Sequence, residues 1–268
     1  GAAANVLSAQ TGCTLRIIDV GVDDDFTPHP QLMQAKVARG TASILHADAM
    51  SAEELERALT AGREAAQEAL RAGHRVMLFG EMGIGNTAIS SLLLSELTGL
   101  PLADCVGPGT GLDSAGVARK LALLERVRQR PTEPFPKGDA AAEAITLLRR
   151  YGGFEIAALA AAISAVAASR NVVLIDGFAV TVAALLAERM QPGTLSRCIV
   201  SHCSAEPAHR LLLEQLRIEP LLSLGLRLGE GSGALLALPL LRNSVALFRN
   251  MATFGSAGVS TKSPGSDG

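Results

Sequence analysis

The fold is decided by residues 171–189, which read NVVLIDGFAVTVAALLAER. Residues 172–175 form a continuous apolar run, which is typical of a parallel strand whose sheet is covered by helices on both faces. The run ends at Asp176-Gly177, and a helical pattern begins at Phe178. A strand, a short turn and a helix in this order form the repeating unit of a parallel α/β sheet.

The same order recurs on both sides of this stretch. We expect strands over 15–22, 75–80 and 197–202, an extended segment over 220–228, a proline-rich loop over 130–139, and helices over 53–72, 87–97, 113–130, 154–169, 178–189, 205–216 and 231–248. This alternation predicts a Rossmann-like parallel sheet with helices on both faces, plus a smaller helical part built from chain-terminal segments. We expect one α/β domain over 1–252 and a flexible tail over 253–268.

Composition excludes several classes of partner. The net charge of −2 gives no basic surface for nucleic acid or an anionic membrane. With no Trp and one Tyr, aromatic surfaces for stacking bases are hard to build. The apolar runs are broken well before the roughly 20 residues that a membrane span needs, so no membrane partner is expected.

The four cysteines stand at positions 13, 105, 198 and 203 and form no CxxC pair. The last two lie near His202 and His209, so a metal site is one interpretation. Buried thiols in a reducing cytoplasm are the favoured one, because an unpaired cysteine commonly acts as a small buried hydrophobe.

Glycines and carboxylates gather where the predicted strands end. The stretches are Glu81-Met-Gly-Ile-Gly-Asn-Thr87, Gly107-Pro-Gly-Thr-Gly111, Asp176-Gly177, Ser201-His-Cys-Ser-Ala-Glu-Pro207 and Arg227-Leu-Gly-Glu-Gly-Ser-Gly233. Ligands of open parallel sheets bind beyond these strand ends. A glycine turn that opens a helix, here capped by Asn86 or Thr87, offers N–H groups to a phosphate. Carboxylates suit sugar hydroxyls or proton transfer, so the combination predicts a ribose phosphate site. Either glycine cluster alone is better explained as an ordinary turn.

Six motifs together resemble one family, nicotinate-nucleotide–dimethylbenzimidazole phosphoribosyltransferase, which makes the lower ligand of cobalamin. They are Gly80-Glu-Met-Gly-Ile-Gly-Asn-Thr87, Gly109-Thr-Gly-Leu-Asp113 with Lys120, Gly152-Gly-Phe-Glu-Ile-Ala157, Leu174-Ile-Asp-Gly-Phe178, Ser201-His-Cys-Ser-Ala-Glu-Pro207 and Leu226-Arg-Leu-Gly-Glu-Gly-Ser-Gly-Ala234. The resemblance implies transfer of the phosphoribosyl group of nicotinate mononucleotide to 5,6-dimethylbenzimidazole. The products are α-ribazole 5′-phosphate and nicotinate. It implies no metal and no cofactor, because the leaving group is a neutral pyridine.

The resemblance also assigns roles to individual residues. Glu230 is the general base that takes a proton from the acceptor. The substrate-binding positions are Glu81, Gly83, Asn86, Gly109, Thr110, Lys120, Asp176 and Ser204. Lys120 neutralises the phosphate, and Asp176 supports the site through bonds to the backbone. The simpler alternatives are a carboxylate that favours the start of a helix for Glu230 and a solvated lysine for Lys120.

Assembly and completeness follow from the same resemblance. It implies a cytoplasmic homodimer, and it implies that an N-terminal portion, which helps to line the benzimidazole pocket in the family, is absent. A second hypothesis is therefore a homologue that binds the nucleotide but is impaired in catalysis. A third, an unrelated Rossmann-type oxidoreductase, is disfavoured because the dinucleotide fingerprint GxGxxG is missing.

Overall fold

The central sheet has three parallel strands. The computed structural model describes residues 1–109, 111–136, 138–253 and 255–258. The strands are β3 (Val76–Phe79), β4 (Val172–Ile175) and β5 (Cys198–Val200), in the order β3-β4-β5. Phe79 lies opposite Ile175, and Ile175 opposite Val200, so all three carboxyl ends meet at one edge.

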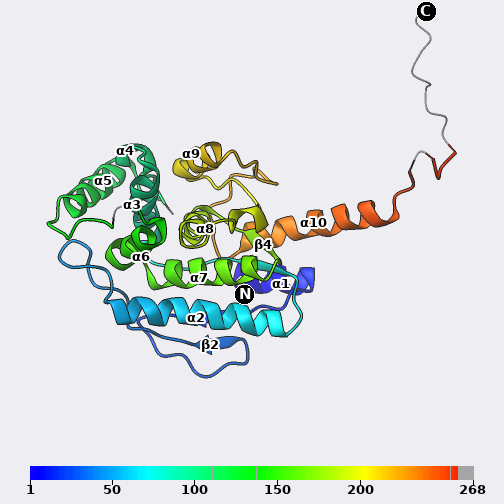
Figure 1. Ribbon diagram of the computed structural model, residues 1–268, viewed down its shortest axis with the longest axis horizontal. Helices are drawn as coiled ribbons and strands as arrows, with labels where there is room; N and C mark the ends of the chain where they lie inside the picture. Colours follow the sequence, from blue (N-terminus) through cyan, green and yellow to red (C-terminus); the bar gives the residue numbers. More distant parts are fainter. Residues whose placement is uncertain (110, 137, 254, 259–268) are drawn as a thin grey trace, which may run out of the picture.

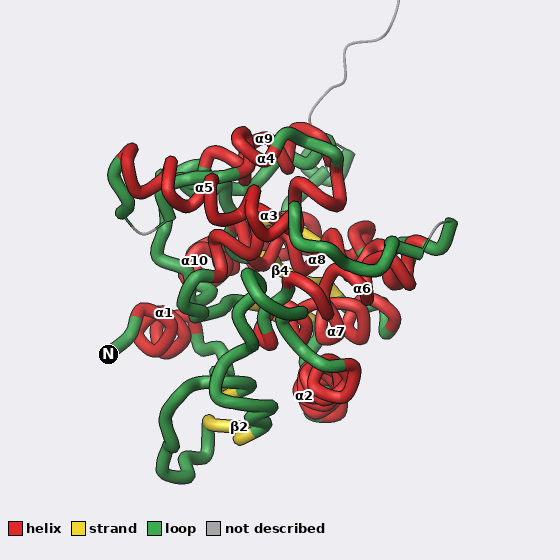
Figure 2. Tube along the Cα trace, turned by 90° about the vertical axis from the view of Figure 1, so that its left-hand side faces the viewer, coloured by secondary structure: helices red, strands yellow, loops and turns green. Residues whose placement is uncertain are grey.

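Helices surround this sheet (Figure 1). In chain order they are α1 (Ala3–Thr11), α2 (Ala52–Arg71), α3 (Asn86–Thr98), α4 (Leu102–Cys105), α5 (Ser114–Arg128), α6 (Ala140–Tyr151), α7 (Phe154–Ala168), α8 (Phe178–Met190), α9 (Pro207–Leu216) and α10 (Ser232–Asn250), with a short 3-10 helix, η1 (Leu195–Arg197), before β5. Figure 1 and Figure 2 both place α4, α5 and α9 at one end of the molecule and α2 at the other. In the described ranges, no helix combines the length and apolar character that crossing a membrane requires.

Strand β4 is apolar at every position because both of its faces are covered. Val173 and Ile175 belong to the main core, which includes α7 and α8, whereas Leu174 packs with Ala234 and Leu238 of α10. Successive side chains of a strand point to opposite faces, so helices on both faces require a continuous apolar run. The prediction from residues 172–175 is confirmed.

The two chain-terminal helices pack against each other. Arg242 of α10 donates a hydrogen bond of 2.5 Å to the carbonyl of Thr11, at the end of α1. This pair is the smaller helical part that the sequence predicts, and α10 also reaches β3 and β4 of the sheet.

Helices α2 and α7 lie unusually close. A Cβ at Gly62 of α2 would stand 1.9 Å from the carbonyl oxygen of Ala158 in α7. Glycine on one helix and alanine along the other leave room for this approach. Helix α2 begins with a capping box, in which Ser51 and Glu54 bond to each other's backbone N–H.

Three expectations about the fold were wrong or incomplete. The first predicted strand is shortened to β1 (Ile17–Asp19), which pairs with β2 (Leu32–Gln34) in a separate parallel sheet. The Asp19 carboxylate accepts the N–H groups of Gly21 and Val22 and so turns the chain away from a longer strand. The glycine stretch 107–111, placed above at a strand end, follows helix α4 instead, and α6 was not predicted.

The C-terminal part of the chain differs from the prediction in one respect. Helix α10 contains Pro239 and continues to Asn250, two residues beyond its predicted end at 248. Residue 254 and residues 259–268, most of the predicted tail, lie outside the described residues.

Candidate active site

Glu81 and Glu230 lie on adjoining segments at the carboxyl edge of the sheet. The N–H of Glu230 donates to the carbonyl of Glu81 at 3.1 Å. A Cβ at Gly80 would lie 2.0 Å from the backbone nitrogen of Gly231, so the two segments touch backbone to backbone. The predicted edge site therefore brings together residues that are far apart in the sequence.

The loop that carries Glu230 has an unusual backbone. Gly229, Glu230 and Gly231 all have positive φ, at 77°, 61° and 75°. A left-handed conformation costs a residue other than glycine about 1 kcal/mol, and such strain is concentrated at functional sites. The partly buried Glu230 carboxylate accepts a 3.4 Å hydrogen bond from the N–H of Ala4 in the first turn of α1.

Asp176 holds this loop from the end of β4. Its buried carboxylate accepts the N–H of Gly231 and the N–H of Ala234, both at 3.1 Å. Nε2 of His202 lies 3.4 Å from the same carboxylate. Asp176 therefore caps the first turn of α10 and fixes the Glu230 loop. It does so through bonds to the backbone, which is the role that the resemblance implies. Its contact with substrate stays a prediction.

The turn between β3 and α3 is built differently from the prediction. Gly85, with φ of 80°, occupies the N-cap position of α3. Neither Asn86 nor Thr87 caps the helix, because Asn86 already belongs to the first turn and its amide donates instead to the Glu81 carboxylate. Gly83 leaves room for Glu155, whose Oε1 would be 2.8 Å from an added Cβ.

Three carboxyl groups cluster behind this turn. Burial, and to a lesser extent the nearby carboxylates of Glu155 and Asp176, raise the pKa of Glu81 to about 7. Burial also raises the pKa of Glu155. Glu155 stands within a motif quoted above, but no role was predicted for it. The only feature of the sequence that pointed to Glu155 was its position shortly after the glycine pair 152–153.

This cluster predicts a pH-dependent stability. The Glu81 pKa rises from 4.5 to about 7 in the folded protein, so between these values only the unfolded chain loses the proton. The folded state therefore loses stability as the pH rises through this window. We expect Glu81→Gln to remove this loss. The free energy of unfolding of the variant, minus that of the parent protein, should therefore rise by on the order of 2 kcal/mol from pH 5 to pH 8.

Urea unfolding of both proteins at the two pH values measures the difference. Glu214→Gln, at an exposed glutamate on α9, removes the same charge without burial and serves as the control. If the difference in unfolding free energy from the parent changes with pH equally for Glu81→Gln and for the control, the raised pKa does not belong to Glu81.

Lys120 is buried rather than solvated. Its side chain is only 9% exposed, and Nζ donates to Thr87 Oγ1 at 3.2 Å and to the carbonyl of Gly107 at 3.0 Å. Burial lowers its pKa. Gly109 also lies beside Thr87, since an added Cβ would stand 3.0 Å from the same hydroxyl. Thr110, another predicted contact, lies outside the described residues.

Glu206 is a second carboxylate for which no role was predicted. It is 6% exposed and lies next to Gly107, and its Oε2 has no hydrogen-bond partner among the described residues. Burial raises its pKa, while Lys120, the N–H of Gly109 and Arg227 lower it. Glu206 thus provides a counter-charge for the Lys120 ammonium. The quoted motif 201–207 contained it, but no local pattern indicated its partner.

Ser204 stands beyond the end of β5. Its Cβ lies near Gly177, and its N–H donates to Nδ1 of His209 at 3.0 Å. The residue is partly buried. It therefore lies near Asp176, on the same edge as the other predicted residues.

Close packing at Gly80 gives a further prediction. Gly80→Ala forces the Gly231 backbone to move, so we expect a loss of about 1–3 kcal/mol in the free energy of unfolding. Thermal and urea unfolding measure it. Gly255→Ala, where the nearest atom to an added Cβ is 3.9 Å away, is the control. Equal stability of the two variants would show that the segments do not meet as described.

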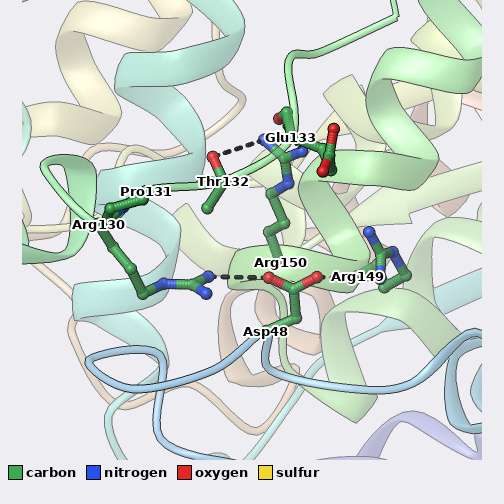
Figure 3. A pocket seen from close by; sticks show the side chains of 7 residues that line it. All are labelled: Asp48, Arg130, Pro131, Thr132, Glu133, Arg149 and Arg150. Atoms are coloured by element: carbon green, nitrogen blue, oxygen red, sulfur yellow. Dashed lines mark hydrogen bonds and ion pairs between the residues drawn. The ribbon is translucent and has the colours of Figure 1, made fainter.

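A separate cavity of about 620 Å³ is lined by none of the site residues named above (Figure 3). It is lined by Asp48, Arg130, Pro131, Thr132, Glu133, Arg149 and Arg150. Asp48 bonds to Arg130 at 2.8 Å and to Arg149 at 2.9 Å, and Arg150 donates to Thr132 at 3.2 Å. Because these guanidinium groups are already bonded to protein partners, the cluster fastens the proline-rich loop to α6.

Comparison with known proteins shows one consistent relationship. The sequence profile of a phosphoribosyltransferase family matches residues 1–259. Nicotinate-nucleotide–dimethylbenzimidazole phosphoribosyltransferase of Cupriavidus necator is 48% identical over 264 residues, which are 98% of this chain and 74% of the relative. The Pseudomonas aeruginosa protein of that name is 45% identical, over 98% of this chain and 73% of its own length.

Solved structures agree with the sequence comparison. The crystal structure of CobT from Thermus thermophilus superposes with a TM-score of 0.89 at 40% identity, covering 98% of this chain and 76% of the other. A second structure from that organism, titled as the dimethylbenzimidazole phosphoribosyltransferase, gives 0.88 with the same coverage. The chain therefore belongs to the nicotinate-nucleotide–dimethylbenzimidazole phosphoribosyltransferase family.

Proposed function

We propose that this protein transfers the phosphoribosyl group of nicotinate mononucleotide to 5,6-dimethylbenzimidazole, with Glu230 as general base. One observation carries the assignment of roles: the single segment 81–87 contacts both halves of the site. Thr87 accepts a hydrogen bond from Lys120, and Glu81 accepts one from the Glu230 backbone. A cation for the phosphate and a carboxylate for the acceptor thus flank one turn.

The nucleotide phosphate binds between Lys120 and the start of α3. A helix N-terminus attracts an anion through its free N–H groups and its dipole, and Gly85 leaves this one open. Lys120 adds a buried positive charge. The pKa of Glu81, raised to about 7, keeps part of that residue neutral at neutral pH, which reduces repulsion of the anionic ligand.

The reaction exchanges one bond at C1′ of the ribose. As the bond from C1′ to the nicotinate nitrogen breaks, its electron pair returns to the cationic ring, which leaves as a neutral pyridine. One benzimidazole nitrogen forms the new bond to C1′. The other nitrogen then becomes acidic, and its proton passes to the Glu230 carboxylate.

Apolar side chains near the edge provide surface for the two aromatic rings. Met82 is 71% exposed, and Ile84 is fully exposed, on the turn that follows β3. Leu228 is also exposed, two residues before Glu230. Exposed apolar groups that gather around a polar site are characteristic of ligand-binding surfaces.

Incubation with nicotinate mononucleotide and dimethylbenzimidazole tests the proposal, with nicotinate release followed over time. Release that requires both substrates supports transfer. Nucleotide binding without release supports the homologue impaired in catalysis. Absence of binding rejects both functions.

A homodimer in the cytoplasm belongs to the same proposal. The outer half of α10 extends away from the body (Figure 1) and exposes Leu240, Val245, Leu247 and Phe248, the last at 92%. An apolar face of this kind suits a contact between subunits. Analytical ultracentrifugation should give the mass of a dimer for the parent protein, and Phe248→Asp should make the dimer dissociate more readily. A parent protein with the mass of a monomer would reject the homodimer. Cell fractionation tests the location.

A further inference from the structure

A buried chain of hydrogen bonds runs behind Ser204. His209 is fully buried, and its Nδ1 lies 3.0 Å from both the N–H and the hydroxyl oxygen of Ser204. Its Nε2 lies 3.0 Å from Thr181 Oγ1. The Thr181 hydroxyl donates in turn to the carbonyl of Gly177 at 2.9 Å. The chain thus links the segments after β4 and β5.

The direction of every hydrogen bond in this chain follows from its two ends. The Ser204 N–H can only donate, so Nδ1 of His209 is an acceptor and carries no proton. The proton of the neutral ring is then on Nε2, which donates to Thr181, whose own hydrogen is committed to Gly177. Because Nδ1 only accepts, the Ser204 hydroxyl can only donate to it. Its lone pairs are then free to accept from a ligand.

We propose that His209 is a positioning residue that turns the Ser204 hydroxyl hydrogen inward and presents the Ser204 oxygen as an acceptor for a ribose hydroxyl of the nucleotide. The inference rests on the proposed function, in which Ser204 contacts the nucleotide. Its location supports this, because Ser204 lies beside Gly177, the residue after Asp176.

A different role, activation of Ser204 as a nucleophile, conflicts with the chemistry of the histidine. A general base must take up the serine proton and become cationic. Burial, and to a lesser extent the neighbouring His202, lower the pKa of His209 to about 3. The rings of Phe178 and His202 lie 6.2 Å and 6.3 Å from the His209 ring, and neither stabilises a cation as a carboxylate would. The imidazole therefore orients the hydroxyl and does not deprotonate it.

Two substitutions distinguish the acceptor role of Nδ1 of His209 from the donor role of Nε2. The Oδ1 of asparagine lies two bonds from Cβ, as Nδ1 does, so His209→Asn keeps an acceptor for Ser204 and loses the bond to Thr181. The amide nitrogen of glutamine lies three bonds from Cβ, as Nε2 does, so His209→Gln keeps a donor for Thr181 and loses the acceptor. Both variants remove the ring, and any general cost of lost packing is therefore shared.

Steady-state kinetics and calorimetry with nicotinate mononucleotide compare the variants. We expect His209→Gln to raise both KM and Kd for the nucleotide about 3- to 10-fold, the fold-change of one uncharged hydrogen bond. His209→Asn should stay within about 2-fold of the parent, and kcat should change less than KM. Adding Ser204→Ala to His209→Gln should cause no further rise, because both changes remove the same contact.

Nitrogen NMR of the parent protein gives a test that needs no turnover. Nitrogen shifts of His209 should identify the neutral tautomer protonated at Nε2 from pH 5 to pH 8. A proton on Nδ1, equal shifts of KM in the Asn and Gln variants, or additive effects of Ser204→Ala and His209→Gln would each overturn the inference. A parent protein that binds the nucleotide without releasing nicotinate would reject the proposed function alone, because Kd and the tautomer still test His209.

Discussion

Glu230→Gln is expected to lower turnover by about two to four orders of magnitude while leaving nucleotide affinity unchanged. The amide has the size of the carboxylate but cannot take a proton from the benzimidazole. Lys120 and the turn 83–87 do not contact the part that changes, so the Kd for nicotinate mononucleotide should stay within about 2-fold of the parent. Single-turnover kinetics with saturating substrates and calorimetry measure the two quantities.

The strained backbone of Glu230 provides a second variant at the same position. Glu230→Gly also removes the carboxylate, but glycine adopts the observed φ of 61° without strain. We expect equal inactivity from Glu230→Gly and a free energy of unfolding equal to that of the parent or up to about 1 kcal/mol higher. Unchanged turnover in either variant would reject Glu230 as the base. Large destabilisation of Glu230→Gly would show instead that the carboxylate holds the loop.

Lys120→Met is expected to raise the Kd for nicotinate mononucleotide by about 10- to 100-fold, the usual value of a hydrogen bond to a charged group. Methionine fills most of the buried space, so lost packing contributes little. Turnover at saturating nucleotide should change much less than Kd, because Lys120 bonds to Thr87 and Gly107 and makes no bond to Glu230. Calorimetry gives the affinity directly.

A matched control separates a specific contact from a general charge effect. Arg119→Met removes one positive charge from an exposed position on the same helix, α5, and should leave Kd within about 2-fold of the parent. An equal loss in both variants, or none in Lys120→Met, would remove Lys120 from the phosphate site. Adding Glu206→Gln to Lys120→Met should recover stability, since the single variant leaves the Glu206 carboxylate buried without its counter-charge.

Much of the site could be read from the sequence because its residues are local to strand ends. A glycine in a short turn before a helix indicates that the backbone turns closely there, and Gly85, Gly109 and Gly231 all have positive φ in the structure. The carboxyl ends of parallel strands meet at one edge by topology alone. Residues 81, 176 and 230 could therefore be grouped before any contact was known.

Partners of buried polar groups could not be read in this way. Glu206 and Glu155 stand in quoted motifs, but each acquires its role from a residue on another element, Lys120 or Glu81. The same holds for the bond from Ser204 through His209 to Thr181, which joins two separate crossovers. Periodicity records which side of an element is buried and carries no information about what it faces.

The sequence by itself determined the architecture and the edge at which the site forms. The apolar run 172–175 requires cover on both faces, and glycines with carboxylates mark the ends of the strands. Only the tertiary structure decided that β1 joins β2 outside the central sheet, that Asp176 fixes the Glu230 loop, and that Lys120 is buried with bonds to Thr87 and Gly107. The physical reason is that local preference depends on neighbours in the chain, whereas these contacts depend on how whole elements pack after they have formed.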